Sequence, residues 1–406
     1  MDMLSKLLPF MDKHLALGLL NHYAQNGEDV GDAMMQLIQT TGLNPDGTIK
    51  SEVEELIRTT TATAQPALTE FFDKFEDQNY TYQFKLMETE IAERRTQGEL
   101  SHEFLAEKKG ITHSVMTAIF QLAYLYYDTG AYGDASELLA LCQCVSGYDS
   151  LPSDMILWGK LMSDIGAVNW QSAMRIAEEI RRLHNASEDD LFGGPNTTTV
   201  RARVWLLHWV LFPFFKGGMQ YSLQLLYFIF DRRDRDLPYR KVVETVCPHY
   251  LRYICAAVLL HRSRAGNFAS TAELVESIYE YSDSLTQLVT LIQKASFEDA
   301  IALLPEVRRT IKEDYFLADY EEDIIENAKR LIFSKYMSLH SVVSIPYVAA
   351  QLDMSKSDAE VWLVNLISES SKHRAKIDSV NEQLNVEPQT RSLETIIYEK
   401  LETALR

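Results

Sequence analysis

One helical pattern occurs twice in the chain, and it limits the possible folds more than any other feature of the sequence. In the first copy an apolar stretch and a Thr-Gly turn lead to a second stretch that opens with Tyr132. In the second copy the equivalent residue is Trp170, 38 positions further on. An alanine follows each aromatic residue three positions later, at Ala135 and Ala173. This period is typical of a helix-turn-helix unit that is stable only when it stacks on its neighbours.

The repeated residues have a physical role at the corner between two helices. An aromatic residue that opens the second helix fills the corner, and the alanine one turn later allows the two helices to approach closely. Phe297 and Ala300 repeat this pair further along the chain. We therefore expect a mainly α fold, with a helical-repeat (TPR/HEAT-like) right-handed solenoid as its main part.

Length and charge restrict the fold and its partners further. The chain has 406 residues, of which 46% are hydrophobic and 24% are charged, as in globular proteins. This length predicts about two or three hydrophobic cores. Its 58 acidic and 39 basic side chains give a net charge of −19, which would repel a phosphate backbone over most of the surface.

Four unevenly spaced cysteines predict a reducing compartment, and so a cytoplasmic protein with a possible nuclear pool. Met1–Leu20 contains four charged residues and lacks the uninterrupted apolar core of a signal peptide. The most apolar tract, Val204–Phe230, is broken by Pro213 and by the Gly217-Gly218 pair. Both resulting pieces are shorter than the ~20 residues of a membrane span, so we expect two buried helices and no membrane contact.

Strand patterns are rare in the sequence. Period-two alternation is visible only faintly, near Lys376–Val386. The threonine-rich stretch Thr59–Thr63, followed by Pro66, predicts a bend or a short linker, because β-branched residues weaken a helix and proline disfavours α geometry just before it.

The C-terminal part shows a different order of elements. A helix is expected over Glu321–Val343, and a short helix with proline in its first turn over Ile345–Leu352. Ser357 and Glu360 have the spacing of a capping box for a third helix, and Ala375–Ser379 is weakly strand-like. This order predicts a winged helix-turn-helix.

A helical solenoid that leads into a winged helix is the layout of the PCI-domain family. Within it the chain resembles the e subunits of eukaryotic translation initiation factor three, on eight short segments that follow one another in order. These are Phe10–Leu15, Trp158–Leu161, Asn169–Trp170, Trp205–Trp209, Cys247–Tyr253, Ile325–Ala328, Trp362–Ile367 and Ala375–Asp378. After Ser379 the sequence departs from the family pattern, because the wing is short and Glu387-Pro388 leads quickly into a last helix.

The resemblance implies a non-catalytic scaffold that joins other PCI and MPN subunits and helps the complex bind the small (40S) ribosomal subunit and recruit mRNA. The expected regions are an N-terminal helical region (1–110), a helical-repeat arm (111–320), a winged-helix module (321–386) and a C-terminal helix (387–406). Two alternatives remain open: a PCI scaffold subunit of the proteasome lid or the COP9 signalosome, and a winged-helix nucleic-acid-binding protein.

Motifs for catalysis or for cofactor binding are not found in the sequence. His102-Glu103 begins a metalloprotease helix, but Ala106 stands where the second histidine is needed. Cys142 and Cys144 lie two positions apart on an expected helix, so their thiols point in different directions and make a poor metal chelate. We therefore expect no enzyme, no catalytic residue, no metal and no cofactor.

Three groups of residues are candidates for contacts with partners. The loop with Arg262 and Arg264 contains no acidic residue and is a candidate for contact with rRNA, mRNA or a partner subunit. The winged helix, by contrast, has four basic and four acidic residues over positions 355–380, so DNA groove reading is not expected. The candidate assembly helix presents one apolar side made of Leu393, Ile397, Leu401 and Ala404. The candidate wing edge for pairing with another sheet comprises Lys376, Ile377 and Asp378.

Overall fold

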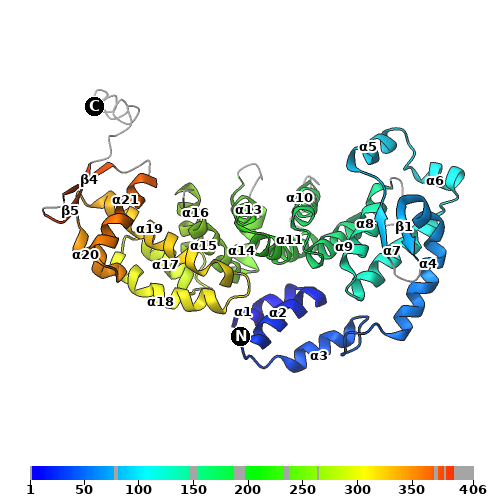
Figure 1. Cartoon of the computed structure of the whole chain (residues 1–406), viewed down its shortest axis with the longest axis horizontal. Helices are drawn as coiled ribbons and strands as arrows, with labels where there is room; N and C mark the ends of the chain where they lie inside the picture. Colours follow the sequence, from blue (N-terminus) through cyan, green and yellow to red (C-terminus); the bar gives the residue numbers. More distant parts are fainter. Residues whose placement is uncertain are drawn as a thin grey trace. The chain divides into compact units, whose positions relative to one another are not determined.

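The computed structural model describes residues 2–76, 81–145, 153–186, 197–231, 237–262, 265–369, 374–378 and 381–387. This part of the chain is mainly helical, as the sequence predicted (Figure 1). The chain divides into two compact units, Met1–His249 and Tyr250–Arg406. None of its described helices combines the length and the apolar character that crossing a bilayer requires.

The first unit opens with short N-terminal helices and a long helix that leads into a β-hairpin, and it continues as a row of helices. The N-terminal elements are α1 (Asp2–Leu7), the 3-10 turn η1 (Leu8–Phe10), α2 (Lys13–Gln25), α3 (Gly31–Thr40), α4 (Ser51–Phe71), β1 (Phe72–Glu76), β2 (Thr81–Phe84), α5 (Glu88–Thr96) and α6 (His102–Lys109). The row comprises α7 (His113–Asp128), α8 (Tyr132–Cys144), α9 (Ser153–Gly166), α10 (Trp170–Ala186), α11 (Thr197–Trp209), α12 (Leu211–Lys216), α13 (Met219–Phe230) and α14 (Pro238–Thr245).

Helices α7 to α11 pack on one another in sequence order, as stacked helical repeats do (Figure 1). Their core is continuous with the N-terminal part, because one cluster of buried residues extends from Ile57 in α4 to Ile156 in α9. The predicted region boundaries, at 110, 320 and 386, remain predictions.

The predicted corner residues open their helices: Tyr132 begins α8, Trp170 begins α10 and Phe297 begins α18. Both Ala135 and Ala173 are fully buried, as close helix packing requires. These elements of the repeat prediction are confirmed.

A polar cluster lies inside the row and connects three helices. Asp164 of α9 is fully buried and accepts hydrogen bonds from Ser136 of α8, at 2.5 Å, and from Ser172 of α10, at 2.6 Å. Lys160, one turn before Asp164 and also buried, lies 3.3 Å from the same carboxylate and donates to Ser136 at 3.0 Å. The cluster therefore fixes how α8, α9 and α10 align, because each buried group depends on the others for its partner.

The expected bend at Thr59–Thr63 was wrong, since α4 continues through it to Phe71. Two of the threonines, Thr60 and Thr61, are buried against the core, and Thr59 and Thr63 donate to carbonyl groups one turn earlier. Burial of this helix face outweighs the low helix propensity of threonine and the proline at Pro66.

The hairpin of β1 and β2 was not predicted. Its strands are antiparallel, with Phe72 opposite Phe84 and the two ring centroids 5.4 Å apart. Phe71, Phe72 and Phe75 have the three- and four-residue spacing of a helix, so the pattern concealed the strand.

The second unit consists of paired helices followed by a small sheet with two helices inserted. Its elements are η3 (Pro248–Tyr250, which begins in the first unit), α15 (Leu251–Leu260), α16 (Ala265–Ser277), α17 (Ser284–Gln293), α18 (Phe297–Glu313), η4 (Ala318–Tyr320), α19 (Glu321–Leu339), β3 (Val342–Ser344), α20 (Ile345–Leu352), α21 (Lys356–Glu369), β4 (Arg374–Asp378) and β5 (Gln383–Glu387).

The winged helix is present as helix α19, short helix α20, helix α21 and a three-stranded antiparallel sheet. The strand order is β3–β5–β4, so β4 is a terminal strand of the sheet.

Two details of the winged-helix prediction were wrong. Helix α19 ends at Leu339, because the residues up to Val343 belong to the next loop and to β3. The cap of α21 is Ser355, whose Oγ accepts from the Asp358 amide at 3.1 Å, and not Ser357.

Candidate functional site

Polar side chains at the start of α2 bind the N-terminal segment to helix α7 of the row. Asp12 caps α2 by accepting from the His14 amide at 3.0 Å, and it also accepts a hydrogen bond from the Tyr127 hydroxyl in α7. Lys13 forms an ion pair with Asp128 at the end of α7. Burial and the Asp12 carboxylate raise the pKa of Tyr127 well above its usual value, so this hydroxyl stays protonated and keeps donating.

A second contact of this segment is aromatic and connects it to a buried pair of histidines. The ring of Phe10 lies 4.5 Å from that of His208 and 6.1 Å from that of His249. The Nε2 atoms of His208 and His249 are 2.9 Å apart, so one of them donates to the other. The indole of Trp209 donates to the Phe10 carbonyl at 2.9 Å. Three segments far apart in the sequence therefore meet at Phe10.

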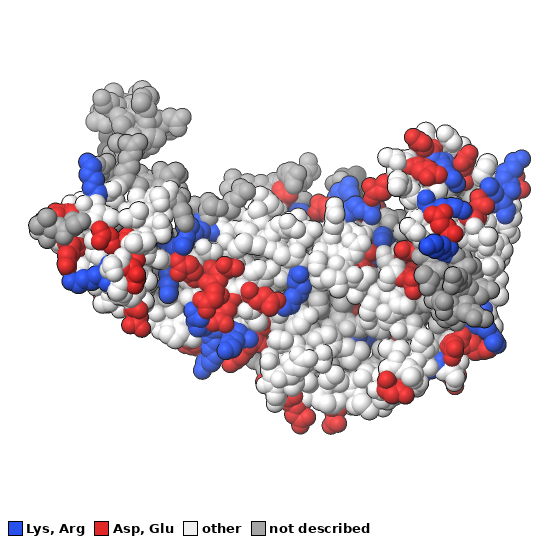
Figure 2. Space-filling view, in the orientation of Figure 1, with Lys and Arg blue, Asp and Glu red and all other residues white. Residues whose placement is uncertain are grey.

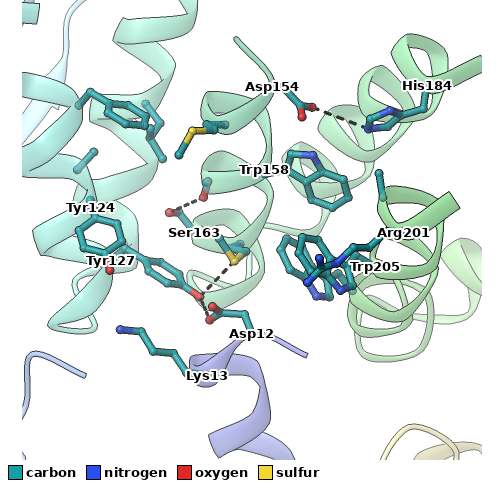
Figure 3. A pocket seen from close by; sticks show the side chains of 18 residues that line it. Asp12, Lys13, Tyr124, Tyr127, Asp154, Trp158, Ser163, His184, Arg201 and Trp205 are labelled. Carbon is teal, nitrogen blue, oxygen red and sulfur yellow. Dashed lines mark hydrogen bonds and ion pairs between the residues drawn. The ribbon is translucent and has the colours of Figure 1, made fainter. Parts of the chain in front are cut away.

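Beside this attachment lies a pocket of about 520 Å³, which is within the range of ligand-binding pockets (Figure 3). It is bordered by α7, α8, α9, α10 and α11 and by the start of α2. Its lining residues are Asp12, Lys13, Phe120, Ala123, Tyr124, Tyr127, Leu139, Asp154, Met155, Trp158, Gly159, Met162, Ser163, His184, Arg201, Ala202, Trp205 and Trp209.

Three of the five tryptophans of the chain line this pocket. Trp205 and Trp209 lie one turn apart on α11 with parallel rings, 6.1 Å between centroids. Trp158 of α9 meets Trp209 edge-on at 4.9 Å. The wall is thus aromatic and is held by contacts between the rings, which leaves a preformed apolar surface.

Charged groups lie at the edges of the pocket. The guanidinium of Arg201 lies over the ring of Trp205, 4.6 Å from its centroid. Asp154 extends toward His184, with 3.8 Å between Oδ1 and Nε2 (Figure 3). Burial lowers the pKa of His184, so its ring is neutral at neutral pH and the Asp154 carboxylate is not compensated by a positive charge there.

The described residues contain no cluster of histidine, cysteine, aspartate or glutamate side chains able to hold a metal ion. Cys142 and Cys144 are buried, and burial raises the pKa of the Cys142 thiol to about 12, which makes it unreactive. The pocket presents aromatic rings and single charged groups, an arrangement suited to binding.

The structure places only some of the predicted contact residues. Arg262 follows α15 and is half-buried, whereas Arg264 lies outside the described residues. Lys376, Ile377 and Asp378 lie in β4, which pairs with β5 on one side. The candidate assembly residues Leu393, Ile397, Leu401 and Ala404 also lie outside the described residues. Their roles remain predictions.

On the face shown in Figure 2, Lys and Arg alternate with Asp and Glu and do not gather into one basic patch. The solvent side of α21, the helix that would enter a DNA groove, carries the exposed Val361 and Val364. This composition suits a protein partner better than a phosphate backbone.

Two domain families and a set of known proteins match the sequence of this chain. Residues 2–126 match the eIF3 subunit 6 N terminal domain, and residues 284–388 match the PCI domain. Along nearly its whole length the chain is similar to the E subunits of eukaryotic translation initiation factor 3. The E subunit of this factor from Emericella nidulans is 29% identical over 400 residues, which cover 93% of this chain and 85% of the relative. The proteins of the same name from Aspergillus niger and Sclerotinia sclerotiorum are each 28% identical, over 93% of this chain and 84% or 85% of their own length.

The segments that carry the resemblance to the E-subunit family meet in space in the first unit. Phe10–Leu15 supplies the N-terminal attachment, Trp158–Leu161 and Trp205–Trp209 supply the tryptophans of the pocket, and Cys247–Tyr253 contains His249. Sequence reasoning identified these segments but not the pocket. Trp205 and Trp209 have the spacing of one helix face, but nothing in the sequence shows that Trp158, on another helix, packs against them.

Proposed function

We propose that this protein is a non-catalytic scaffold subunit of eukaryotic translation initiation factor 3. The observation that carries the proposal is the match to the E subunits of this factor along nearly the whole chain, together with the matches to the eIF3 subunit 6 N terminal domain and the PCI domain. The helical row and the winged helix supply extended surfaces for contacts with other proteins, and a scaffold needs such surfaces.

Its direct partners are other PCI and MPN subunits of the complex. The exposed Val361 and Val364 on α21 and the terminal strand β4 are the surfaces of the winged helix that support such contacts. Pairing at Lys376–Asp378 would add a neighbouring strand to the sheet. Through the complex, the protein helps to bind the small (40S) ribosomal subunit and to recruit mRNA in the cytoplasm, with a second pool in the nucleus.

The experiment that tests this function is affinity purification of the tagged full chain with mass spectrometry, combined with a sucrose gradient. We expect initiation factor 3 subunits in the purified complex and co-migration with small ribosomal subunits. Recovery of proteasome-lid or signalosome subunits in their place would overturn the assignment and favour the alternative PCI complexes.

Two variants separate the proposed contacts. Deletion of residues 389–406 removes the apolar positions Leu393, Ile397, Leu401 and Ala404, and it should leave a folded protein that fails to enter the complex. Full incorporation of the truncated chain would contradict the assembly role of this segment.

Charge reversal at Arg262 and Arg264 tests the proposed RNA contact. The double variant should weaken ribosome association more at low salt than at high salt, because phosphate contacts release counterions. An identical salt profile for the variant and the original chain would remove the RNA contact from the proposal.

A further inference from the structure

The pocket of the first unit combines an apolar wall with an exposed arginine that pairs with no carboxylate of the described residues, and we propose that it binds a partner-protein segment in which an aromatic or large aliphatic side chain lies beside a carboxylate. This inference rests on the scaffold function proposed above and specifies the chemistry of one of its partners.

The apolar part of the pocket is open to a partner. Tyr124 on α7 is 61% exposed and Met155 on α9 is 58% exposed, although both are large apolar side chains next to the tryptophan wall. Exposed apolar groups beside a preformed aromatic pocket are typical of protein-protein contact sites, where one anchor side chain fills the pocket. A volume of about 520 Å³ accommodates such an anchor together with its neighbours.

The charge expected of the bound partner segment follows from the charged side chains that line the pocket and from which of them already form ion pairs or hydrogen bonds within the chain. Lys13 is paired with Asp128, and Asp12 accepts from Tyr127, so these two charges are satisfied within the chain. Arg201 is different, because it is exposed to solvent with its guanidinium over the Trp205 ring, and no carboxylate among the described residues pairs with it. An acidic side chain of a partner would replace water at this guanidinium and form a charge-assisted hydrogen bond.

Two further donors point to the same kind of ligand. The indole N–H groups of Trp158 and Trp205 have no acceptor within the described part of the chain, whereas that of Trp209 is used by Phe10. Arg201 already lies against Trp205, so a ligand cation would meet a positive charge at this ring. Asp154 is the acidic group of the lining that would favour a basic ligand, but it lies beside His184 and away from Arg201 and Trp205 (Figure 3).

The inference is tested by selecting random 16-residue peptides displayed on phage against the full-length chain. Selected peptides are then labelled and their dissociation constants measured by fluorescence anisotropy. We expect enriched peptides to share an aromatic or large aliphatic residue within a few positions of Asp or Glu. Enrichment of basic peptides, or no enrichment, would overturn the proposal, and so would a concentration-dependent dimer of the chain that the peptides do not dissociate.

Matched variants locate the binding site. R201E should weaken binding of the selected peptides by about tenfold or more, and replacing the acidic residue of the peptide by Lys should restore binding to R201E. R182E makes the same charge change at an exposed position of α10 outside the pocket and should leave binding unchanged. Y124A should weaken binding, while Y279A, at a residue that is 91% exposed in the second unit, should not.

Equal effects of R201E and R182E would contradict the assignment of the site. A failure of the peptide-binding inference can be told apart from a failure of the proposed scaffold function. A chain that enters the initiation factor complex but binds no acidic peptide in this pocket refutes only the present inference. A chain that binds such peptides but does not enter the complex refutes only the function.

Discussion

The ring of Tyr132, at the start of α8, lies so close over Gly166, at the end of α9, that a β-carbon on the glycine would stand 2.6 Å from the ring. Trp170, at the start of α10, makes a comparable contact with Gly217, where a β-carbon would lie 3.1 Å from the indole, 2.8 Å from the Tyr221 ring and 2.4 Å from the Pro213 carbonyl oxygen. At both places an aromatic residue that opens one helix packs against a glycine at or just after the end of a later helix.

Replacing either glycine by alanine should destabilise the first unit. The added methyl group meets a packed ring at Gly166 and a backbone oxygen at Gly217, and overpacking of this kind costs about 1–3 kcal/mol. Chemical denaturation of G166A and G217A measures the loss. G18A is the control, because a β-carbon at Gly18 in α2 meets no atom within 4 Å and alanine favours the helix. Equal stabilities for the three variants would contradict the ring-on-glycine contact.

The polar cluster around Asp164 gives a second prediction. D164A leaves Lys160 buried without its carboxylate, and breaking a buried pair in this way costs about 3–5 kcal/mol in the free energy of unfolding. The exposed pair of Arg58 and Glu55 provides the control, since E55A should cost less than about 1 kcal/mol. A small loss in D164A would show that Lys160 reaches solvent or another acceptor.

Glu137 should oppose folding at alkaline pH. Burial, followed by the nearby Asp134, raises the pKa of Glu137 in the folded protein to about 7, above the usual value of an unfolded glutamate. The folded state therefore binds the proton more tightly, and stability falls as the pH rises from about 4.5 to about 7. E137Q should raise the free energy of unfolding at pH 8 by about 1 kcal/mol, after discounting for its partial exposure.

The gain of E137Q should vanish near pH 3, below the pKa of Glu137 in both the unfolded and the folded chain, where the glutamate is neutral in both states. Thermal unfolding at the two pH values measures the difference. E93Q, at an exposed position of α5, is the control and should show no gain that depends on pH.

The buried His208 should have the opposite pH dependence. Burial, together with the neighbouring His249, lowers the pKa of His208 to about 3. The unfolded chain therefore binds a proton that the folded chain excludes, and stability falls as the pH drops from about 6.5 toward 3. Between pH 7 and pH 5 this loss is about 2 kcal/mol.

Urea unfolding at pH 7 and pH 5 checks the role of His208. The variant H208N should lose less stability over this interval than the original chain, whatever its stability at pH 7. H340Q, at an exposed histidine of the second unit, should retain the full acid sensitivity. An equal decrease in all three proteins would place the titrating group elsewhere.

The sequence predicted the features that depend on local patterns. The three- and four-residue spacing predicted the helices, and Tyr132, Trp170 and Phe297 marked the starts of theirs. The winged helix followed from its order of helices and turns. The β1–β2 hairpin and the continuous helix α4 were missed because burial against a core, which the sequence does not display, decided both.

The pocket was missed for a related reason. Its tryptophans, Trp158 on α9 and Trp205 and Trp209 on α11, meet only through the stacking of helices. The same applies to His208 and His249, which come from two distant segments and were not recognised as a pair. Single-sequence patterns report the neighbours on one helix, whereas these contacts depend on how the helices pack.

The position of Phe10 has a consequence for synthesis. The surface on which Phe10 packs is formed by His208, Trp209 and His249. The hydrogen bond between Trp209 and Phe10 joins residues 199 positions apart. At about 5–20 residues per second, translation delivers His249 about 10 to 50 seconds after Phe10. During that interval the start of the nascent chain has no completed surface on which to dock, so chaperones or assembly partners have time to reach it first.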